Sequence, residues 1–181
     1  MEIDCINCPG PERYTERMNW IAEYLETGRQ AYTDHYCHLW PGSNPDPYLS
    51  RNFTRHILDE TLGRPQLVHW LMYAGGKAAG VCKIDLERNH PHFLPANSLF
   101  LEKIYFRSRY TGKGLGSQVL QRITSLAGQV GRKGIWLEAM QKGPALAFYQ
   151  KEGFRILGET AIPYPEVLPD EKPMWVLGKA L

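Results

Sequence analysis

A glycine-rich stretch just past the middle of the chain has the composition of a phosphate-binding turn. Residues 109–118 read RYTGKGLGSQ and bring Gly112, Gly114 and Gly116 close together. Glycine has no Cβ atom, so another molecule can approach the backbone closely and unusual dihedral angles become accessible. A helical pattern follows from Leu115, and a glycine turn that opens a helix directs free N–H groups and the positive end of the helix dipole at one point. The stretch therefore predicts a site for a phosphate-bearing ligand.

The cysteines and the paired histidines do not form a recognisable metal motif. Cys5 and Cys8 make a C-x-x-C, but neither a second C-x-x-C nor an H-x₃₋₅-H accompanies it. In a strand over residues 2–8 the two thiols would point to opposite faces. We therefore expect reduced thiols and no metal, and we interpret His90 and His92 as part of a polar loop.

Composition narrows the class of protein. The 181 residues are 43% hydrophobic, which suits a single domain, residues 1–181, with one sizeable core. The formal net charge is +2 and no long basic run is present, so nucleic acid is not an expected partner. The opening MEIDCINC lacks the apolar segment of a signal peptide, and no apolar run is long enough to span a bilayer. We expect a cytoplasmic protein with no membrane partner.

Hydrophobic spacing predicts the elements that position the glycine turn. Helical spacing marks residues 13–32 and a second helix over 47–62, with Asp46 as its N-cap and Gly63 at its end. Strand patterns mark EIDCI, a hairpin of LVHWLMY and AAGVCKIDL with its turn at Gly75 and Gly76, and a strand over 98–106. After the glycine turn come a helix from Leu115, the strand GIWLEAM, the short helix PALAFYQKEGF, and the strands RILGE and MWVLGKAL. This order predicts an α/β (α+β) fold with a mixed, mostly antiparallel sheet and helices on both faces.

Two well-known phosphate-binding motifs fit the turn poorly. A dinucleotide-binding unit has the same order of strand, turn, helix and strand, and Glu138 stands where its ribose ligand is expected. Its glycines are spaced G-x-G-x-x-G, however, whereas here they are spaced G-x-G-x-G, and residues 107–111 separate the strand from Gly112. A Walker loop is excluded because neither Ser nor Thr follows Lys113.

Two segments, in order, resemble the signature motifs of the GNAT superfamily of N-acetyltransferases. LEKIYFRSRYTGKGLGSQVL resembles the acetyl-CoA-binding motif, in which a strand is followed by R/Q-G-x-G-x-G and a helix, although Thr111 stands in the R/Q position. GPALAFYQKEGF resembles the second signature, a short helix with A-x-x-F/L-Y-x-x-x-G-F, although Lys142 replaces a frequent Asn. The resemblance covers residues 66 to 158, and LE-x-x-Y around Glu102 looks most like the polyamine and small-amine acetyltransferases. It implies a central sheet of six to seven strands.

The resemblance also implies a co-substrate, a reaction and site residues. Acetyl-CoA is the implied co-substrate, and the amine of a small molecule attacks its thioester directly, without a metal. Glu102 is implied as the general base, directly or through a water, and Tyr149 as the acid that protonates the leaving thiolate. We expect Ala145, Ala147 and Phe148 to form the packing face of the short helix, which leaves Tyr149 free for this role. The implied CoA-binding residues are Ile104, Tyr105, Phe106, Arg109, Thr111, Gly112, Lys113, Gly114, Leu115, Gly116, Ser117, Lys142 and Ala145.

The acceptor and the assembly are left open. The helices over 13–32 and 47–62 and the loop before the last strand should shape the acceptor pocket, and AYTDHYCHLW either holds a cation or packs the helix. Polyamines, antibiotic amines, amino acids and protein N-termini all stay candidates, and a homodimer is left open. The second functional class is a domain of this fold that binds acyl-CoA without turnover, as a sensor or interaction domain.

Overall fold

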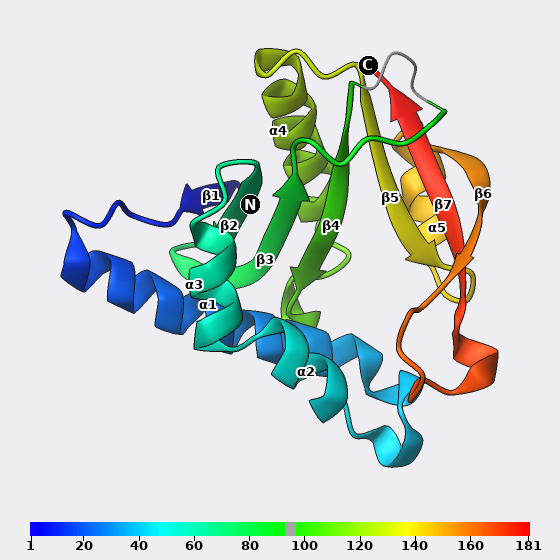
Figure 1. Cartoon of the computed structure of the whole chain (residues 1–181), viewed down its shortest axis with the longest axis horizontal. Helices are drawn as coiled ribbons and strands as arrows, with labels where there is room; N and C mark the ends of the chain where they lie inside the picture. Colours follow the sequence, from blue (N-terminus) through cyan, green and yellow to red (C-terminus); the bar gives the residue numbers. More distant parts are fainter. Residues whose placement is uncertain (93–96) are drawn as a thin grey trace.

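The computed structural model describes residues 1–92 and 97–181, which form one seven-stranded sheet with helices on both faces (Figure 1). The strands are β1 (Ile3–Asn7), β2 (Leu67–Ala74), β3 (Lys77–Asp85), β4 (Ser98–Phe106), β5 (Gly134–Met140), β6 (Arg155–Ala161) and β7 (Pro173–Ala180). The helices are α1 (Tyr14–Tyr36), α2 (Asp46–Asn52), α3 (Arg55–Leu62), α4 (Leu115–Gln129) and α5 (Ala145–Lys151).

The strand order is β1-β2-β3-β4-β5-β7-β6. Among the described strands, β4 and β5 are the only parallel neighbours, and α4 is the crossover that parallel strands require. The sequence-based fold, a mixed and mostly antiparallel sheet of six to seven strands, is confirmed. The predicted hairpin between β2 and β3 also forms, and both of its turn glycines have positive φ, +60° at Gly75 and +71° at Gly76.

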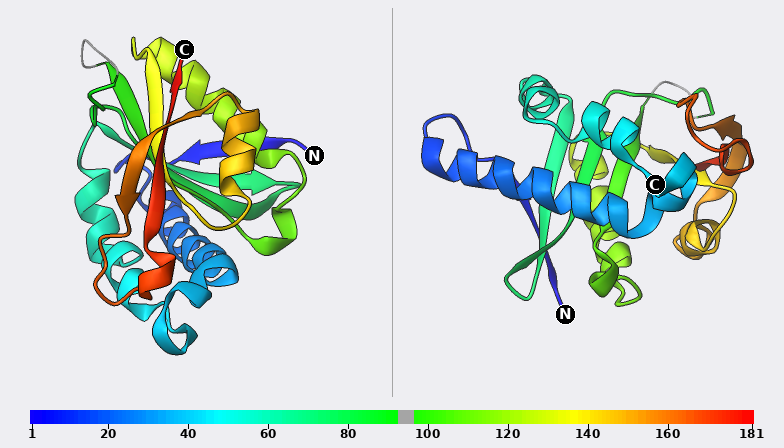
Figure 2. Two further views of the ribbon diagram at one scale, coloured as in Figure 1. Left: turned by 90° about the vertical axis from the view of Figure 1, so that its right-hand side faces the viewer. Right: turned by 90° about the horizontal axis from the view of Figure 1, so that it is seen from below.

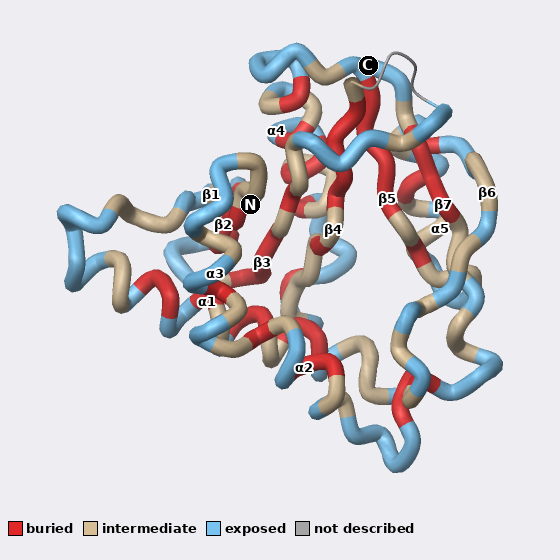
Figure 3. The backbone as a smooth tube through the Cα atoms, viewed as in Figure 1, coloured by how far each residue is buried: buried red, intermediate tan, exposed pale blue. Residues whose placement is uncertain are grey.

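Two large hydrophobic cores lie on the two faces of the sheet, and Phe100, Trp136 and Val176 form a third, smaller cluster. Helices α1–α3 cover one face, and α4 and α5 cover the other (Figure 2). Along β3, Val81 packs with the first group, whereas Cys82 and Ile84 pack with the second, as the alternation of a strand requires. Figure 3 shows the buried stretches running through the central strands and the helix sides that face them. None of the described helices is both long and apolar enough to cross a bilayer.

The N-terminal helices differ from the prediction in two places. Helix α1 runs on to Tyr36, and the segment expected as one helix over 47–62 is two, α2 and α3. The break falls at Phe53, whose ring packs where Gly28 of α1 leaves room, and Thr54 then starts α3 by accepting a hydrogen bond from the Ile57 N–H at 3.4 Å. Asp46 is the first residue of α2 and makes no side-chain cap.

A β-bulge in β4 sets up the site described below. Lys103 is paired with Lys83 of β3, but the next pair is Leu101 with Ile84, so Glu102 is an extra residue on β4. A bulge of this kind bends its strand and breaks the side-chain alternation locally. Glu102 and Lys103 consequently both face α1–α3.

Candidate active site

The sheet opens between its two parallel strands. Strand β4 pairs with β5 only over residues 98–101 and 134–137, and Figure 1 shows the strands diverging beyond these pairs. From there on, residues 103–106 pair with β3 alone and residues 138–140 with β7 alone, within the described sheet. The facing edges of β4 and β5 therefore present backbone groups to which an extended molecule can add like a strand.

The glycine turn has the geometry of an anion site. Gly112 and Gly114 have φ of +70° and +74°, and a Cβ atom added at either would meet no atom within 4 Å. Gly114 directly precedes the first residue of α4. The backbone N–H groups of residues 112–117 make no hydrogen bond within the described protein, so they are free for a ligand at the positive end of the helix.

Gly116 serves packing instead. A Cβ atom there would lie 2.9 Å from Cζ of Phe148, so the missing side chain lets α5 pack against the first turn of α4. Ser117 ties the same two helices, because its hydroxyl donates to Glu152 Oε1 at 2.5 Å. Leu115 is buried in the core cluster on this face. Leu115, Gly116 and Ser117 were all predicted to bind CoA. Their backbone N–H groups are available for this, but their side-chain positions are used for packing.

The predicted basic residues lie at different distances from the turn. The Arg109 guanidinium and the Lys113 ammonium lie 4.9 and 5.8 Å from the Tyr110 ring centroid, next to the turn. Lys142, in the loop before α5, is ion-paired with Glu171 at 2.7 Å. Arg109 and Lys113 are thus near the free N–H groups, whereas Lys142 is held toward the β6–β7 connection.

Tyr149 is more deeply buried than we expected. It is 8% exposed and packs edge-on to Phe148 and Phe154, with ring centroids 5.0 and 5.5 Å away, whereas Ala147 is exposed. The packing face of α5 therefore includes Tyr149, because the helix turns this residue, and not Ala147, toward the sheet. Its hydroxyl makes no hydrogen bond within the described protein, and burial raises the pKa of the phenol above its usual value.

Glu102 is the centre of an ion-pair cluster. Its carboxylate binds Lys83, with Nζ 2.7 Å from Oε2, and also binds the neighbouring Lys103. The three side chains are only 26%, 14% and 6% exposed. Burial alone raises the pKa of the Glu102 carboxyl, but the charges of Lys103 and Lys83 outweigh burial and lower this pKa to about 2. Glu102 is therefore ionised at neutral pH.

An aromatic cluster lies beside the opening, on the α1–α3 face. The rings of Tyr32 and Tyr48 stack with centroids 3.9 Å apart, and the Tyr48 and Tyr105 hydroxyls are hydrogen-bonded at 2.9 Å. Tyr105 thus contributes its side chain to this cluster. The cluster consists of Tyr32, Tyr36, Tyr48, Phe53, Tyr105 and Tyr164.

The polar residues of AYTDHYCHLW attach α1 to the end of β4. Asp34 accepts a hydrogen bond from the Ser108 N–H at 2.8 Å, and His35 Nε2 lies 3.0 Å from the Phe106 carbonyl oxygen. The sequence leaves two roles open for this segment, holding a cation or packing the helix. Asp34 and His35 serve the second role, because they fix α1 to the end of β4.

His35 occupies the Phe106 carbonyl oxygen at the opening. The Arg107 N–H bonds Ala79 O of β3, so the backbone of Tyr105 also points to β3 and that of Ile104 points to the opening.

Sequence reasoning missed the ion-pair cluster, although a signal for it was present. LEKIYF places two adjacent charges, Glu102 and Lys103, inside an apolar strand, and Lys83 interrupts an apolar strand as well. Two adjacent polar residues break strand alternation and indicate a bulge.

The two thiols of the C-x-x-C lie on opposite faces of the sheet, as expected: Cys5 packs on the α4 side and Cys8 on the α1 side. No group of three His, Cys, Asp or Glu residues in the described part of the chain is arranged to hold a metal ion.

Comparison with known proteins identifies related sequences and folds. The model of a family described as "Acetyltransferase (GNAT) family" matches residues 29–154. A protein of Lactobacillus delbrueckii subsp. lactis named "Uncharacterized N-acetyltransferase in pepI 3'region" is 22% identical over 163 residues, which cover 89% of this chain and 92% of that protein.

Solved structures share the whole fold. The PaiA N-acetyltransferase from Thermoplasma acidophilum, in complex with coenzyme A, superimposes with a TM-score of 0.73 over 100% of both chains at 14% identity. The acetyltransferase of the GNAT family from Streptococcus pneumoniae gives a TM-score of 0.67 over 99% of both chains at 19% identity. At these identities the similarity shows the fold.

Proposed function

The chain belongs to the acetyltransferase (GNAT) family, and from that premise we propose that it transfers the acetyl group of acetyl-CoA to a primary amine of a small molecule. The observation that carries the proposal is the alignment of two binding features on β4 and α4. The strand has an unpaired edge beyond Leu101, and the turn that follows it leaves the N–H groups of residues 112–117 free.

Acetyl-CoA fits both features. Its pantetheine arm is extended and carries amide groups, so it can pair with the free edge of β4 around Ile104. Its pyrophosphate can accept hydrogen bonds from the N–H groups at the start of α4, and Arg109 and Lys113 lie close enough to add positive charge. The PaiA protein, whose fold is shared, was solved with coenzyme A.

The reaction is attack of a neutral amine on the thioester carbon. A C–N bond forms, the C–S bond breaks, and a proton moves from the nitrogen to the thiolate through protein groups or water. The tetrahedral intermediate needs a hydrogen-bond donor for its oxyanion, and a backbone N–H of β4 near Ile104 lies at the opening. We propose Tyr149 as the acid for the thiolate, because its phenol is protonated at neutral pH and its hydroxyl has no partner within the described protein. Burial raises the pKa of this phenol and so makes it a weak proton donor, which the approaching negative charge of the thiolate must offset.

Glu102 stays our candidate for the base, with a condition that the ion pairs impose. Its pKa of about 2 makes the carboxylate a weak proton acceptor for an ammonium group with a pKa of about 10.4. Proton transfer to Glu102 thus requires that the bound acceptor weaken its pairing with Lys83 and Lys103. A chain of water molecules is the alternative route for the proton.

A thiol-release assay tests the proposed function. The purified protein is mixed with acetyl-CoA and separate amines: polyamines, amino acids, aminoglycosides and a peptide N-terminus. Free thiol that appears only when an amine is present supports transfer. If CoA binds by calorimetry but no amine releases thiol, the protein is an acyl-CoA sensor and the proposed activity is wrong.

A further inference from the structure

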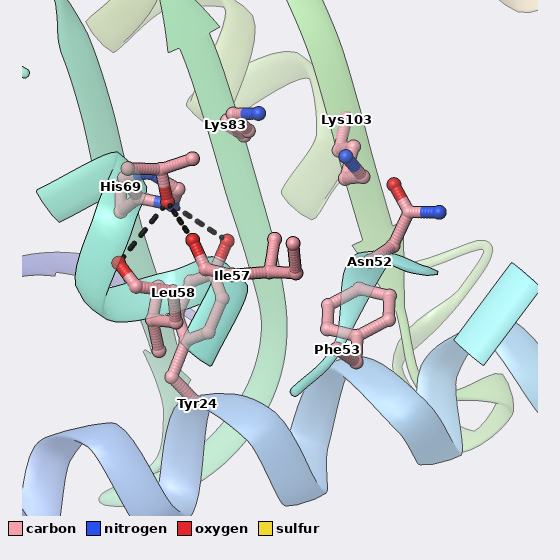
Figure 4. Close-up of a pocket in the computed structure, with 9 residues that line it drawn as sticks. Tyr24, Asn52, Phe53, Ile57, Leu58, His69, Lys83 and Lys103 are labelled. Atoms are coloured by element: carbon pink, nitrogen blue, oxygen red, sulfur yellow. Dashed lines mark hydrogen bonds between the residues drawn. The ribbon is translucent and has the colours of Figure 1, made fainter. Parts of the chain in front are cut away.

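A small cavity next to Glu102 holds more positive than negative charge. It lies between β2–β4 and the helices α1–α3, and we call it the lysine cavity (Figure 4). It is lined by Lys83, Lys103, His69, Tyr24, Asn52 and Phe53, with Ile57, Leu58 and Thr61 of α3 completing the wall. Figure 4 shows the ends of both lysine side chains between the strands and the Asn52–Phe53 segment.

The charges of the lysine cavity do not balance. Two ammonium groups share one carboxylate, that of Glu102, and no other acidic side chain in the described protein lies within ion-pair distance of them. Burial lowers the pKa of Lys103, which shows the cost of its charge at this site. A buried charge without a full partner is unfavourable, so the cavity favours an additional anion.

His69 provides an independent indication of a missing ligand. Its side chain is 5% exposed, and its Nε2 atom is buried without a hydrogen-bond partner in the described protein. Its Nδ1 atom lies 3.2 Å from the Tyr24 hydroxyl. Burial, with the charges of Lys83 and Lys103, lowers the pKa of His69 to about 3, so the ring is neutral. With Tyr24 donating to Nδ1, the ring proton sits on Nε2 and is available to an acceptor atom.

The lysine cavity is close to the reaction site that the proposed function requires. Lys103 belongs to the bulge at which β4 leaves β5, and Ile104, where the thioester arm pairs, is the next residue. Phe53 lines the cavity and also packs on Tyr105, at 6.5 Å between ring centroids, so the cavity joins the aromatic cluster. With about 20 Å³, the cavity accommodates an atom the size of a water molecule, such as one oxygen of a carboxylate.

We propose that the lysine cavity binds the carboxylate of the acceptor, so that the acceptor is an amino acid or a related amino-carboxylic acid and not a polyamine. The proposal rests on the proposed function. Lys83 and Lys103 bind the carboxylate, His69 Nε2 donates to it, and the aromatic cluster takes an apolar side chain. A polyamine carries only positive charge and would be repelled by the two ammonium groups.

Anion binding in the cavity also meets the condition on Glu102. The ammonium groups of Lys83 and Lys103 lower the pKa of Glu102. A bound carboxylate competes with Glu102 for these two groups. It also brings a like charge close to Glu102. Both changes raise the pKa of Glu102 and make it a better base when, and only when, the acceptor is bound.

Matched amines separate this proposal from the proposed function. We would measure the thiol-release kinetics of phenylalanine, phenylalaninamide, phenethylamine and spermidine with acetyl-CoA. The expected result is a KM for phenylalanine about 10- to 100-fold below those of the amide and the decarboxylated amine, the usual range for a charge-assisted pair. If the amide, phenethylamine or spermidine is acetylated as well as phenylalanine, the transferase activity stands and the carboxylate site is overturned.

Charge-removing variants test the cavity itself. Lys83→Met is expected to erase the preference for phenylalanine over phenylalaninamide, whereas Lys77→Met, at the exposed end of the same strand, is expected to keep it. A purely structural role for Lys83 would lower both activities together and leave their ratio unchanged, which would overturn the proposal. Loss of folding is checked by urea denaturation, and Lys103→Met serves as the second variant.

Formate distinguishes a substrate carboxylate from a free anion. Sodium formate should raise the KM for phenylalanine in the wild-type protein by competition, and it should have no such effect in Lys83→Met. If formate instead stimulates the acetylation of phenethylamine and leaves phenylalanine unaffected, a free anion occupies the cavity and the acceptor assignment is wrong.

If no amine is acetylated, the proposed function fails. Calorimetric binding of N-acetylphenylalanine but not its amide, with CoA present, then supports the carboxylate site, and absence of binding overturns it.

Discussion

Replacing Gly114 by valine should separate CoA binding from folding. Gly114 has a φ of +74°, and an added Cβ would meet no protein atom within 4 Å, so the cost to the fold is backbone strain alone. A non-glycine residue in this conformation costs about 1–3 kcal/mol, which a domain with about 5–15 kcal/mol of stability tolerates. The side chain would instead occupy the space in front of the free N–H groups of residues 112–117.

The expected loss of affinity follows from those N–H groups. Each charge-assisted hydrogen bond to phosphate contributes about 1.5–3 kcal/mol, so losing two weakens binding by about 3–6 kcal/mol, or roughly 10²- to 10⁴-fold. Calorimetry with CoA measures the affinity, and urea denaturation measures the stability of the same samples.

Gly131 provides a matched control for the strain. It lies just after the other end of α4, has a φ of +72°, and also has open space around an added Cβ. Gly131→Val should lose similar stability and keep its CoA affinity. If a folded Gly114→Val protein binds CoA within about threefold of wild type, or if both variants lose affinity equally, the glycine turn is not the pyrophosphate site.

Three further substitutions test the roles of single side chains. Glu102→Gln should lower turnover about 10²-fold or more, and the loss should shrink at high pH, where the amine is neutral without help; a pH-independent loss would assign Glu102 to positioning. The pKa of Glu102 is lowered from 4.5 to about 2, so its carboxylate stabilises the fold above pH 4.5, and this contribution disappears as the pH falls toward 2. Glu102→Gln lacks this carboxylate. Between pH 4.5 and 2 it should therefore lose less stability than the wild type, as measured by urea unfolding against pH. Tyr149→Phe should keep stability and CoA affinity but lower turnover by about 10²- to 10³-fold in steady-state assays, and unchanged turnover would leave the phenol a packing group. Gly116→Val should lower the free energy of unfolding by about 1–3 kcal/mol in urea, because the new Cβ would press on Phe148. The control Gly128→Ala, on the open side of α4, should not destabilise the protein. If Gly116→Val is as stable as the wild type, the close packing of α4 on α5 is refuted.

The features predictable from sequence were those with strong local patterns. Strand β4 begins and ends where its apolar pattern does, and α4 begins at Leu115, directly after the glycines that open it. Local pattern and tertiary structure agree at these positions, so short windows suffice.

The features that were missed depend on contacts between distant segments. The break at Phe53 arises because its ring packs against Gly28 of α1, which no local window contains. The pairing of Glu102 with Lys83 depends on the register of β3 and β4, and that register includes a bulge. Tyr149 is buried because tertiary contacts decide which side of α5 faces the sheet. One of these contacts is that of Phe148 with Gly116 of α4.

Acetyl transfer to an amine is the central claim, and carbon labelling tests it most directly. The protein is incubated with acetyl-CoA labelled with ¹³C at the carbonyl carbon and with the best amine of the panel, and the product is followed by NMR. The label is expected to appear in the amide of the acetylated amine, in step with the release of CoA thiol. Label that stays in acetyl-CoA, or that appears as free acetate with the amine unchanged, would contradict this claim.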